Sequence, residues 1–165
     1  MRKVSVLLVM LMLPLLTWAQ TKVTASEIIA KINRGEAVSY KNAVIEGDLD
    51  MTRLQNMKQK RNKGRYESRE YISTVTAPLT FVNCTFKGDV LAYHNPEANV
   101  SLKGNNSEVY NTNFEEDVVF ENCTFEEKSA FKYSEFDGKA SFVGSRFTEE
   151  ALFKYAEFDE VVNFS

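Results

Sequence analysis

The sequence predicts an all-β protein, a parallel β-solenoid in which each coil of about 22 residues is built from four short strands. Three observations predict this class. Phenylalanine recurs in alternating steps of six and five residues through the second half of the 165-residue chain. A small or β-branched residue stands two positions before each of these phenylalanines. The phrase FKYSEF at 131–136 returns as FKYAEF at 153–158, 22 residues later.

The spacing of the phenylalanines is the first observation. It is neither the 3.6-residue period of a helix nor the two-residue alternation of one long strand. It is the spacing expected when each short strand contributes one large inward side chain and a corner follows. We call these ten residues the phenylalanine ladder: Phe114, Phe120, Phe125, Phe131, Phe136, Phe142, Phe147, Phe153, Phe158 and Phe164.

The residues two positions before the ladder are the second observation. None of them carries a charge, although residues 108–165 hold 14 acidic and 5 basic side chains. A small position beside an aromatic one indicates two adjacent inward sites in a narrow interior. The small positions are Thr112, Val118, Cys123, Ser129, Ser134, Ala140, Ser145, Ala151, Ala156 and Val162.

The repeated phrase is the third observation, because four steps of the ladder make one coil of 22 residues. Phe131 then stacks on Phe153, and Tyr133 on Tyr155. Adjacent parallel strands lie about 4.8 Å apart, so each residue meets its counterpart in the next coil. Burial of each phenylalanine contributes about 1.5–3 kcal/mol, which makes the ladder the main source of cohesion.

These residues also carry a family resemblance. The run FENCTFEEKSAFKYSEFDGKASFVGSRFTEEALFKYAEF at 120–158 resembles pentapeptide-repeat proteins of the F-x-x-[small]-x-F variant. The resemblance implies a right-handed, four-sided β-helix and an exported bacterial member of that family. It is clear over 109–164 and looser in two earlier stretches. In the first of these, Val44, Leu49 and Leu54 step by five; the second is FVNCTFKGDVLA at 81–92.

The first 19 residues have the pattern of a signal peptide. A basic start at Arg2 and Lys3 precedes an apolar run from Val4 to Trp18, and Ala19 suits a cleavage site. About 15 apolar residues are short of the roughly 20 that span a bilayer, although an uncleaved anchor is the alternative. We therefore expect an exported protein, periplasmic or extracellular, with no membrane span after cleavage. The remaining chain, 20–165, is one domain with 18 basic and 23 acidic side chains.

Residues 20–36 are predicted to form a short helical cap on the first coil. In TASEIIAKINRG (24–35), Thr24 and Glu27 match a capping box, and three isoleucines give one apolar face. A partner-binding helix is the alternative. The β-helix then occupies 37–165, interrupted by loops at about 55–72 and 93–108. The stretch 53–70 holds seven basic residues and two glutamates, typical of a solvated loop or, alternatively, of an anion-binding patch.

No residue pattern predicts catalysis, so we expect no enzyme, no cofactor and no metal site. Cys84 and Cys123 both occupy the small inward position of F-x-N-C-T-F, which favours buried thiols. A disulfide stays open, because the 39 residues between them stack the two cysteines only if an excursion of 17 separates the coils. His94 is the one histidine and lies in loop-like sequence. The acidic residues of the second half are typical of a solvated face.

The sequence leaves three functional hypotheses. The first is a structural or protein-interaction module, and the second is a glycan-binding protein. Candidate surface contacts are an outward row of two tyrosines and two lysines: Tyr133, Tyr155, Lys132 and Lys154. The third comes from the resemblance, since some family members mimic DNA and shield topoisomerases. The net charge of −9 over 108–165 suits mimicry, but predicted export contradicts it and also argues against a nucleic-acid partner.

The expected partner is an unidentified protein or a second copy of the chain. The printed sequence ends in EFDEVVNFS, so Phe164 has no polar cap after it. The resemblance implies a homodimer through the C-terminal coil, and a truncated sequence is the other explanation. The sequence names neither the partner nor the ligand.

Overall fold

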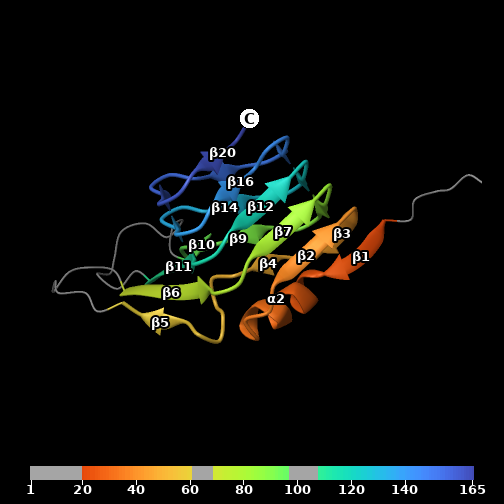
Figure 1. The fold of residues 1–165 in the computed structure, drawn as a ribbon. Coiled ribbons are helices and arrows are strands. Elements are labelled where there is room, and N and C mark those ends of the chain that lie inside the picture. The colour runs from red at the N-terminus through yellow and green to blue at the C-terminus, as the bar shows by residue number, and fades with distance from the viewer. Residues whose placement is uncertain (1–19, 61–68, 97–107) are drawn as a thin grey trace, which may run out of the picture.

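The computed structural model describes residues 20–60, 69–96 and 108–165 (Figure 1). The predicted signal peptide, 1–19, lies outside these residues, as do 61–68 and 97–107. The described part is built of strands with one short helix, α2 (Ala25–Asn33). The strands are β1 (Thr21–Thr24), β2 (Val38–Lys41), β3 (Ala43–Glu46), β4 (Leu49–Asp50), β5 (Lys58–Gln59), β6 (Arg69–Val75), β7 (Leu79–Val82), β8 (Thr85–Phe86), β9 (Val90–Leu91), β10 (Tyr93–His94), β11 (Glu108–Phe114), β12 (Val118–Glu121), β13 (Thr124–Phe125), β14 (Ser129–Ala130), β15 (Glu135–Phe136), β16 (Ala140–Ser141), β17 (Arg146–Phe147), β18 (Ala151–Leu152), β19 (Glu157–Phe158) and β20 (Val162–Asn163).

The described strands form four sheets, and the chain visits them in the same order in each coil. Their strand orders are β2-β7-β12-β16-β20, β1-β3-β8-β13-β17, β4-β9-β14-β18 and β5-β6-β11-β15-β19, with β10 beside β11. Every pairing in these sheets is parallel except β10 with β11 and β5 with β6. The fold is therefore a parallel β-solenoid, stacked from α2 at one end to β20 at the other (Figure 1).

The register follows the predicted repeat. Phe125 pairs with Phe147, and Phe136 with Phe158, each 22 residues apart. Phe81 pairs with Phe120 across 39 residues, because the segment between β10 and β11 adds an excursion of 17 to that coil. Stacked rings in these columns have centroids about 5 Å apart and nearly parallel planes, as in the 4.6 Å contact of Phe125 with Phe147.

The ladder is not buried uniformly. Its first six members, Phe114 to Phe142, are buried. Phe147, Phe153 and Phe158 are partly exposed, and Phe164 is 50% exposed. The small position behaves likewise, since Ser134 is buried and Ala156 is partly exposed. The described residues place no further coil over the last one, so the final phenylalanines are covered from one side only.

Helix α2 covers the opposite end of the stack. The Thr24 hydroxyl accepts from the Glu27 amide at 3.3 Å, and the Glu27 carboxylate accepts from the Thr24 amide at 3.2 Å, which completes the capping box. Ile28 and Ile32 are buried in the core of the first coil. Strand β1, which was not expected within 20–36, pairs with β3 and extends this first layer.

The predicted register of the first coil is wrong by one residue. Ile45, not Val44, pairs with Phe86 of the next coil. Leu49 pairs with Val90, which in turn pairs with Ser129, so Leu49 fills a small position and not an aromatic one. Aliphatic side chains occupy both kinds of inward site here, and a step of five then fits two registers equally well.

Both predicted loops contain strands, so their boundaries need correction. Strands β5 and β6 lie within or across 55–72, and β10 and the start of β11 lie within 93–108. Strands β6 and β11 pair over seven residues each, which is longer than the two to four residues of the other sides. Their backbone ladder compensates for side chains too polar to predict a buried strand.

Candidate functional site

The predicted outward row exists as a stacked pair of tyrosines with lysines beside them. The rings of Tyr133 and Tyr155 lie 5.1 Å apart and 14° from parallel, and they are 41% and 59% exposed. Lys132 Nζ lies 4.7 Å from the Tyr133 ring centroid, and Lys154 Nζ lies 4.8 Å from that of Tyr155. At such distances an ammonium is attracted to the aromatic ring.

Both tyrosines stand at corners where the backbone is left-handed, with φ of 59° and 61°. Asparagines occupy the equivalent conformation in another corner column, where Asn42, Asn83 and Asn122 have φ between 50° and 54°. Asparagine tolerates this region, whereas a bulky side chain costs about 1–2 kcal/mol there. The tyrosine corners therefore retain an aromatic side chain at an unfavourable backbone position.

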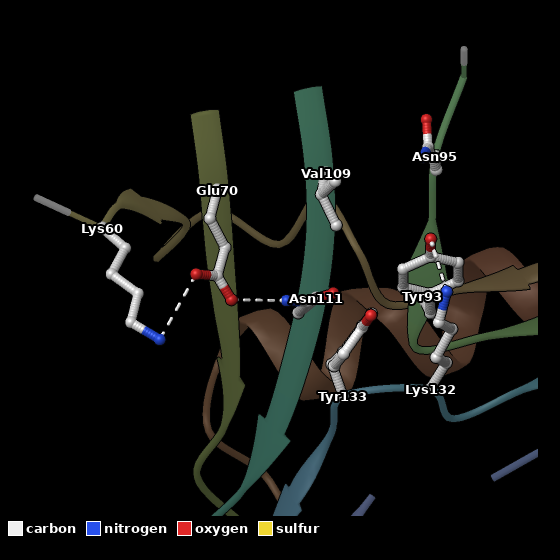
Figure 2. A pocket seen from close by; sticks show the side chains of 8 residues that line it. All are labelled: Lys60, Glu70, Tyr93, Asn95, Val109, Asn111, Lys132 and Tyr133. Carbon is white, nitrogen blue, oxygen red and sulfur yellow. Dashed lines mark hydrogen bonds and ion pairs between the residues drawn. The ribbon is translucent and has the colours of Figure 1, made fainter. Parts of the chain in front are cut away.

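A hollow of about 490 Å³ opens beside Tyr133, on the outer face of the sheet that contains β6 and β11 (Figure 2). Val109 and Asn111 come from β11, Glu70 from β6 and Tyr93 from β10, while Tyr133 comes from a corner of the next coil. The full lining is Lys60, Glu70, Tyr93, Asn95, Val109, Asn111, Lys132 and Tyr133. Residues distant in sequence thus meet at one place.

The polar groups of this hollow form two short chains (Figure 2). Lys60 Nζ lies 3.3 Å from Glu70 Oε2, and Asn111 Nδ2 donates to Glu70 Oε1 at 2.7 Å. Across the hollow, Lys132 Nζ donates to the Tyr93 hydroxyl at 3.4 Å. The carbonyl oxygen of Asn111, Oδ1, is buried and accepts no hydrogen bond from the described residues.

A second hollow of about 320 Å³ continues from the first toward the C-terminal coils. It shares Lys60, Glu70 and Tyr133 with the first and adds Glu135, Tyr155 and Glu157. Glu135 pairs with Glu157 in adjacent strands, so these carboxylates form a second outward row. We call the two hollows together the outer groove. It crosses successive coils.

The predicted contact residues divide between the two hollows. Tyr133 and Lys132 line the first, Tyr133 and Tyr155 line the second, and Lys154 is in neither lining. Sequence reasoning missed Glu70, Asn111 and Tyr93, which fell in predicted loops. The alternating character of REYISTV (69–75) and EVYNTNF (108–114) was the available signal for strands there.

The two cysteines are stacked free thiols in the core. Thr85 and Thr124, the residues that follow them, are paired in register, and both cysteines are buried. Each sulfur lies near a backbone carbonyl, as Cys123 Sγ does at 3.4 Å from the Phe81 oxygen. A hydrogen bond with Cys123 lowers the pKa of Cys84 to about 7, and the same pairing, with burial, raises the pKa of Cys123.

The acidic corners are partly neutralised by lysines from neighbouring coils. Glu126 pairs with Lys87, and Glu150 with Lys128 at 3.0 Å. Over 20–60, 69–96 and 108–165 no group of three or more side chains is arranged to hold a metal ion. Within the same ranges, no helix has both the length and the apolar character of a membrane span.

The strand order and the 22-residue register define the class of this protein as a β-solenoid. Residues 110–157 match the family described as Pentapeptide repeats (9 copies), and the chain is a pentapeptide-repeat protein. No curated protein and no solved structure matches it. Members of this family are generally non-enzymatic repeat proteins, which favours a structural or interaction module.

Proposed function

We propose that this protein is an exported, non-enzymatic interaction module that presents rows of outward side chains to a partner on a rigid, right-handed, four-sided coil. The supporting observation is the division between its interior and its surface. Phenylalanine rings stack through the interior, as Phe120 does between Phe81 and Phe142 at 5.3 and 5.6 Å. Polar and aromatic side chains gather outside, in the outer groove.

Rows of this kind suit recognition because stacking holds them in place before a partner arrives. Tyr133 and Tyr155 support one another, and Glu135 is held by the Asn113 amide at 2.6 Å. Side chains that are already ordered lose less conformational entropy on binding. A repeated surface with preset spacing can therefore bind tightly with few contacts.

Export is the second part of the proposal and rests on the sequence of residues 1–19. We expect the chain expressed in a Gram-negative host to appear outside the cytoplasm with Gln20 as its first residue. N-terminal sequencing of periplasmic and cytoplasmic fractions tests this. An Ala19→Leu variant should stay uncleaved, because signal peptidase requires a small residue there. Full-length protein in the cytosol would contradict export and favour the DNA-mimic hypothesis.

The interaction itself is tested by affinity capture. Tagged mature protein is incubated with envelope extract of its own source, and the retained proteins are identified. The same is done with a Tyr133→Ala/Tyr155→Ala variant and with Tyr71→Ala, which removes a stacked tyrosine outside the groove lining. We expect a defined partner with the wild type and the Tyr71 variant and its loss with the double variant. Light scattering of the purified protein shows whether that partner is a second copy. An identical retained set for all three proteins would refute recognition through the groove.

A further inference from the structure

We propose that the outer groove binds an uncharged oligosaccharide, with one sugar unit seated in the first hollow over Asn111. This inference rests on the proposed interaction role and adds the place and the chemical class of a ligand. It commits to a glycan, which the lining favours over a peptide or a polyanion for the reasons that follow.

The first reason is the unsatisfied acceptor in the lining. Asn111 is 2% exposed, and its amide nitrogen is already committed to Glu70. Its Oδ1 has no donor among the described residues. A buried carbonyl without a donor is unfavourable, so the site is completed by a group that brings a hydroxyl or N–H. Sugar hydroxyls supply such donors from several directions at once.

The second reason is how the tyrosines are presented. The Tyr133 ring is already held by Tyr155 and by the Lys132 ammonium. Its hydroxyl end points into the hollow, between Asn111 and Tyr93 (Figure 2). The rings of Tyr93 and Tyr133 lie 5.8 Å apart and 55° from parallel. The lining therefore offers hydroxyl groups and ring edges, which suit a ligand with alternating C–H and O–H groups.

The third reason is charge and polarity. Glu70 is balanced by Lys60, while Glu135 and Glu157 line the continuation of the groove without a lysine of their own in that lining. These carboxylates repel a polyanion such as a uronic acid polymer or a nucleic acid. Val109 is the one aliphatic side chain in either lining, so no apolar pocket is available to anchor a peptide side chain.

The shape of the groove agrees with a chain-like ligand. Hollows of about 490 and 320 Å³ fall within the roughly 300–1,000 Å³ of small-molecule sites. They share three lining residues and follow one another along the coils. A ligand longer than one sugar unit would pass from the first hollow to the second over Tyr133.

The test titrates the full chain with neutral hexasaccharides and follows binding by calorimetry. The probes are hexamers of cellulose, chitin, starch and β-mannan, with a galacturonic acid hexamer as the anionic comparison. We expect saturable binding of at least one neutral hexamer and none of the anionic one. Asn111→Leu should weaken that binding at least about tenfold, because the sugar loses a buried polar partner. Asn163→Leu makes the same amide-to-alkyl change on β20, away from the groove, and should bind as the wild type does.

A milder variant keeps the proposal falsifiable if Asn111→Leu fails to fold. Tyr133→Phe removes one hydroxyl, leaves the ring stack intact and should weaken binding several-fold. Binding of no neutral hexamer, preference for the anionic hexamer, or wild-type affinity in the folded variants would each overturn the glycan assignment. A protein partner still captured from the envelope would then leave the proposed function standing, whereas loss of both results would remove both.

Discussion

The two ends of this solenoid carry similar inward side chains and treat them differently. At the first coil, α2 lies over the core and buries Ile28 and Ile32. At the last described coil nothing comparable covers the interior, and Phe164 and Val161 are 50% and 71% exposed. The comparison teaches that the repeat defines which residues point inward, whereas stacking on both sides defines which are buried.

A second contrast, between corners, has the same lesson. The asparagine corners pair along the stack, as where Asn83 Nδ2 donates to Asn42 Oδ1 at 3.1 Å. The tyrosine corners share the left-handed backbone but hold their side chains by ring stacking. In both columns a neighbour in the adjacent coil determines the role of the residue.

The largest expected effect separates the middle of the ladder from its end. Phe120→Ala should lower the free energy of unfolding by about 3–5 kcal/mol, because it leaves a cavity between two stacked rings. Phe164→Ala should cost about 1 kcal/mol, since half of that side chain is already in water. Urea denaturation of both variants measures the difference. Equal losses would show that the last coil is covered in solution.

The next effect concerns the covered end. Ile28→Ala should cost about 2–5 kcal/mol, because Ile28 is fully buried between α2 and the first coil. Val161→Ala, the comparison at the open end, should change stability by less than about 0.5 kcal/mol. Thermal unfolding followed by circular dichroism is sufficient. A small loss for Ile28→Ala would mean that the helix does not cap the stack in solution.

The stacked thiols predict a pH dependence for the middle of the stack. The folded pKa of Cys84 is about 7, below its ordinary value of 9.0, so the unfolded chain holds more protons between these values and stability rises with pH there. The pKa of Cys123 is raised, so the folded chain holds more protons above pH 9 and stability falls. Urea denaturation from pH 6.5 to 10.5 should show the maximum near 9.

The serine variants provide the control for that profile. Cys84→Ser should remove the rise, and Cys123→Ser should remove the pairing that causes both shifts. Ser145 follows in the same column one coil later, where its hydroxyl donates to the Phe120 carbonyl at 2.6 Å, so serine is compatible with the position. An unchanged profile in both variants would show that other groups titrate.

The smallest effects compare the two corners. Asn122→Ala should cost about 1 kcal/mol, because alanine tolerates the left-handed backbone less well than asparagine. Tyr155→Asn should stay within about 0.5 kcal/mol of the wild type, since relief of the backbone offsets the lost ring contact. Denaturation midpoints at constant slope measure both. A large loss for Tyr155→Asn would assign the tyrosine row to stability.

The part of the fold that could be predicted is the part where one residue type marks one site. Ten phenylalanines at regular steps specify strands, corners and register from Phe114 onward. The first coil lacked this marker, because aliphatic side chains fill both inward sites and Val44 and Ile45 fit the pattern equally. Strands β6 and β11 were missed because their pairing with one another stabilises them more than their own composition does.

The candidate site was predictable only in part, for a related reason. Tyr133 and Lys132 could be found because they recur 22 residues later as Tyr155 and Lys154. Glu70, Tyr93 and Asn111 have no such recurrence. They meet only because β10 turns back antiparallel on β11 while β6 lies on its other side.

The sequence by itself determined the repeat, the inward ladder and the family, because a periodic interior requires a periodic chain. Only the tertiary structure decided which ladder residues are buried, which register the first coil takes and where the outer groove lies. Burial depends on neighbours in the coils above and below, and the groove depends on residues between 60 and 133 that converge across three coils. Local patterns report the direction of a side chain, whereas long-range stacking sets its surroundings.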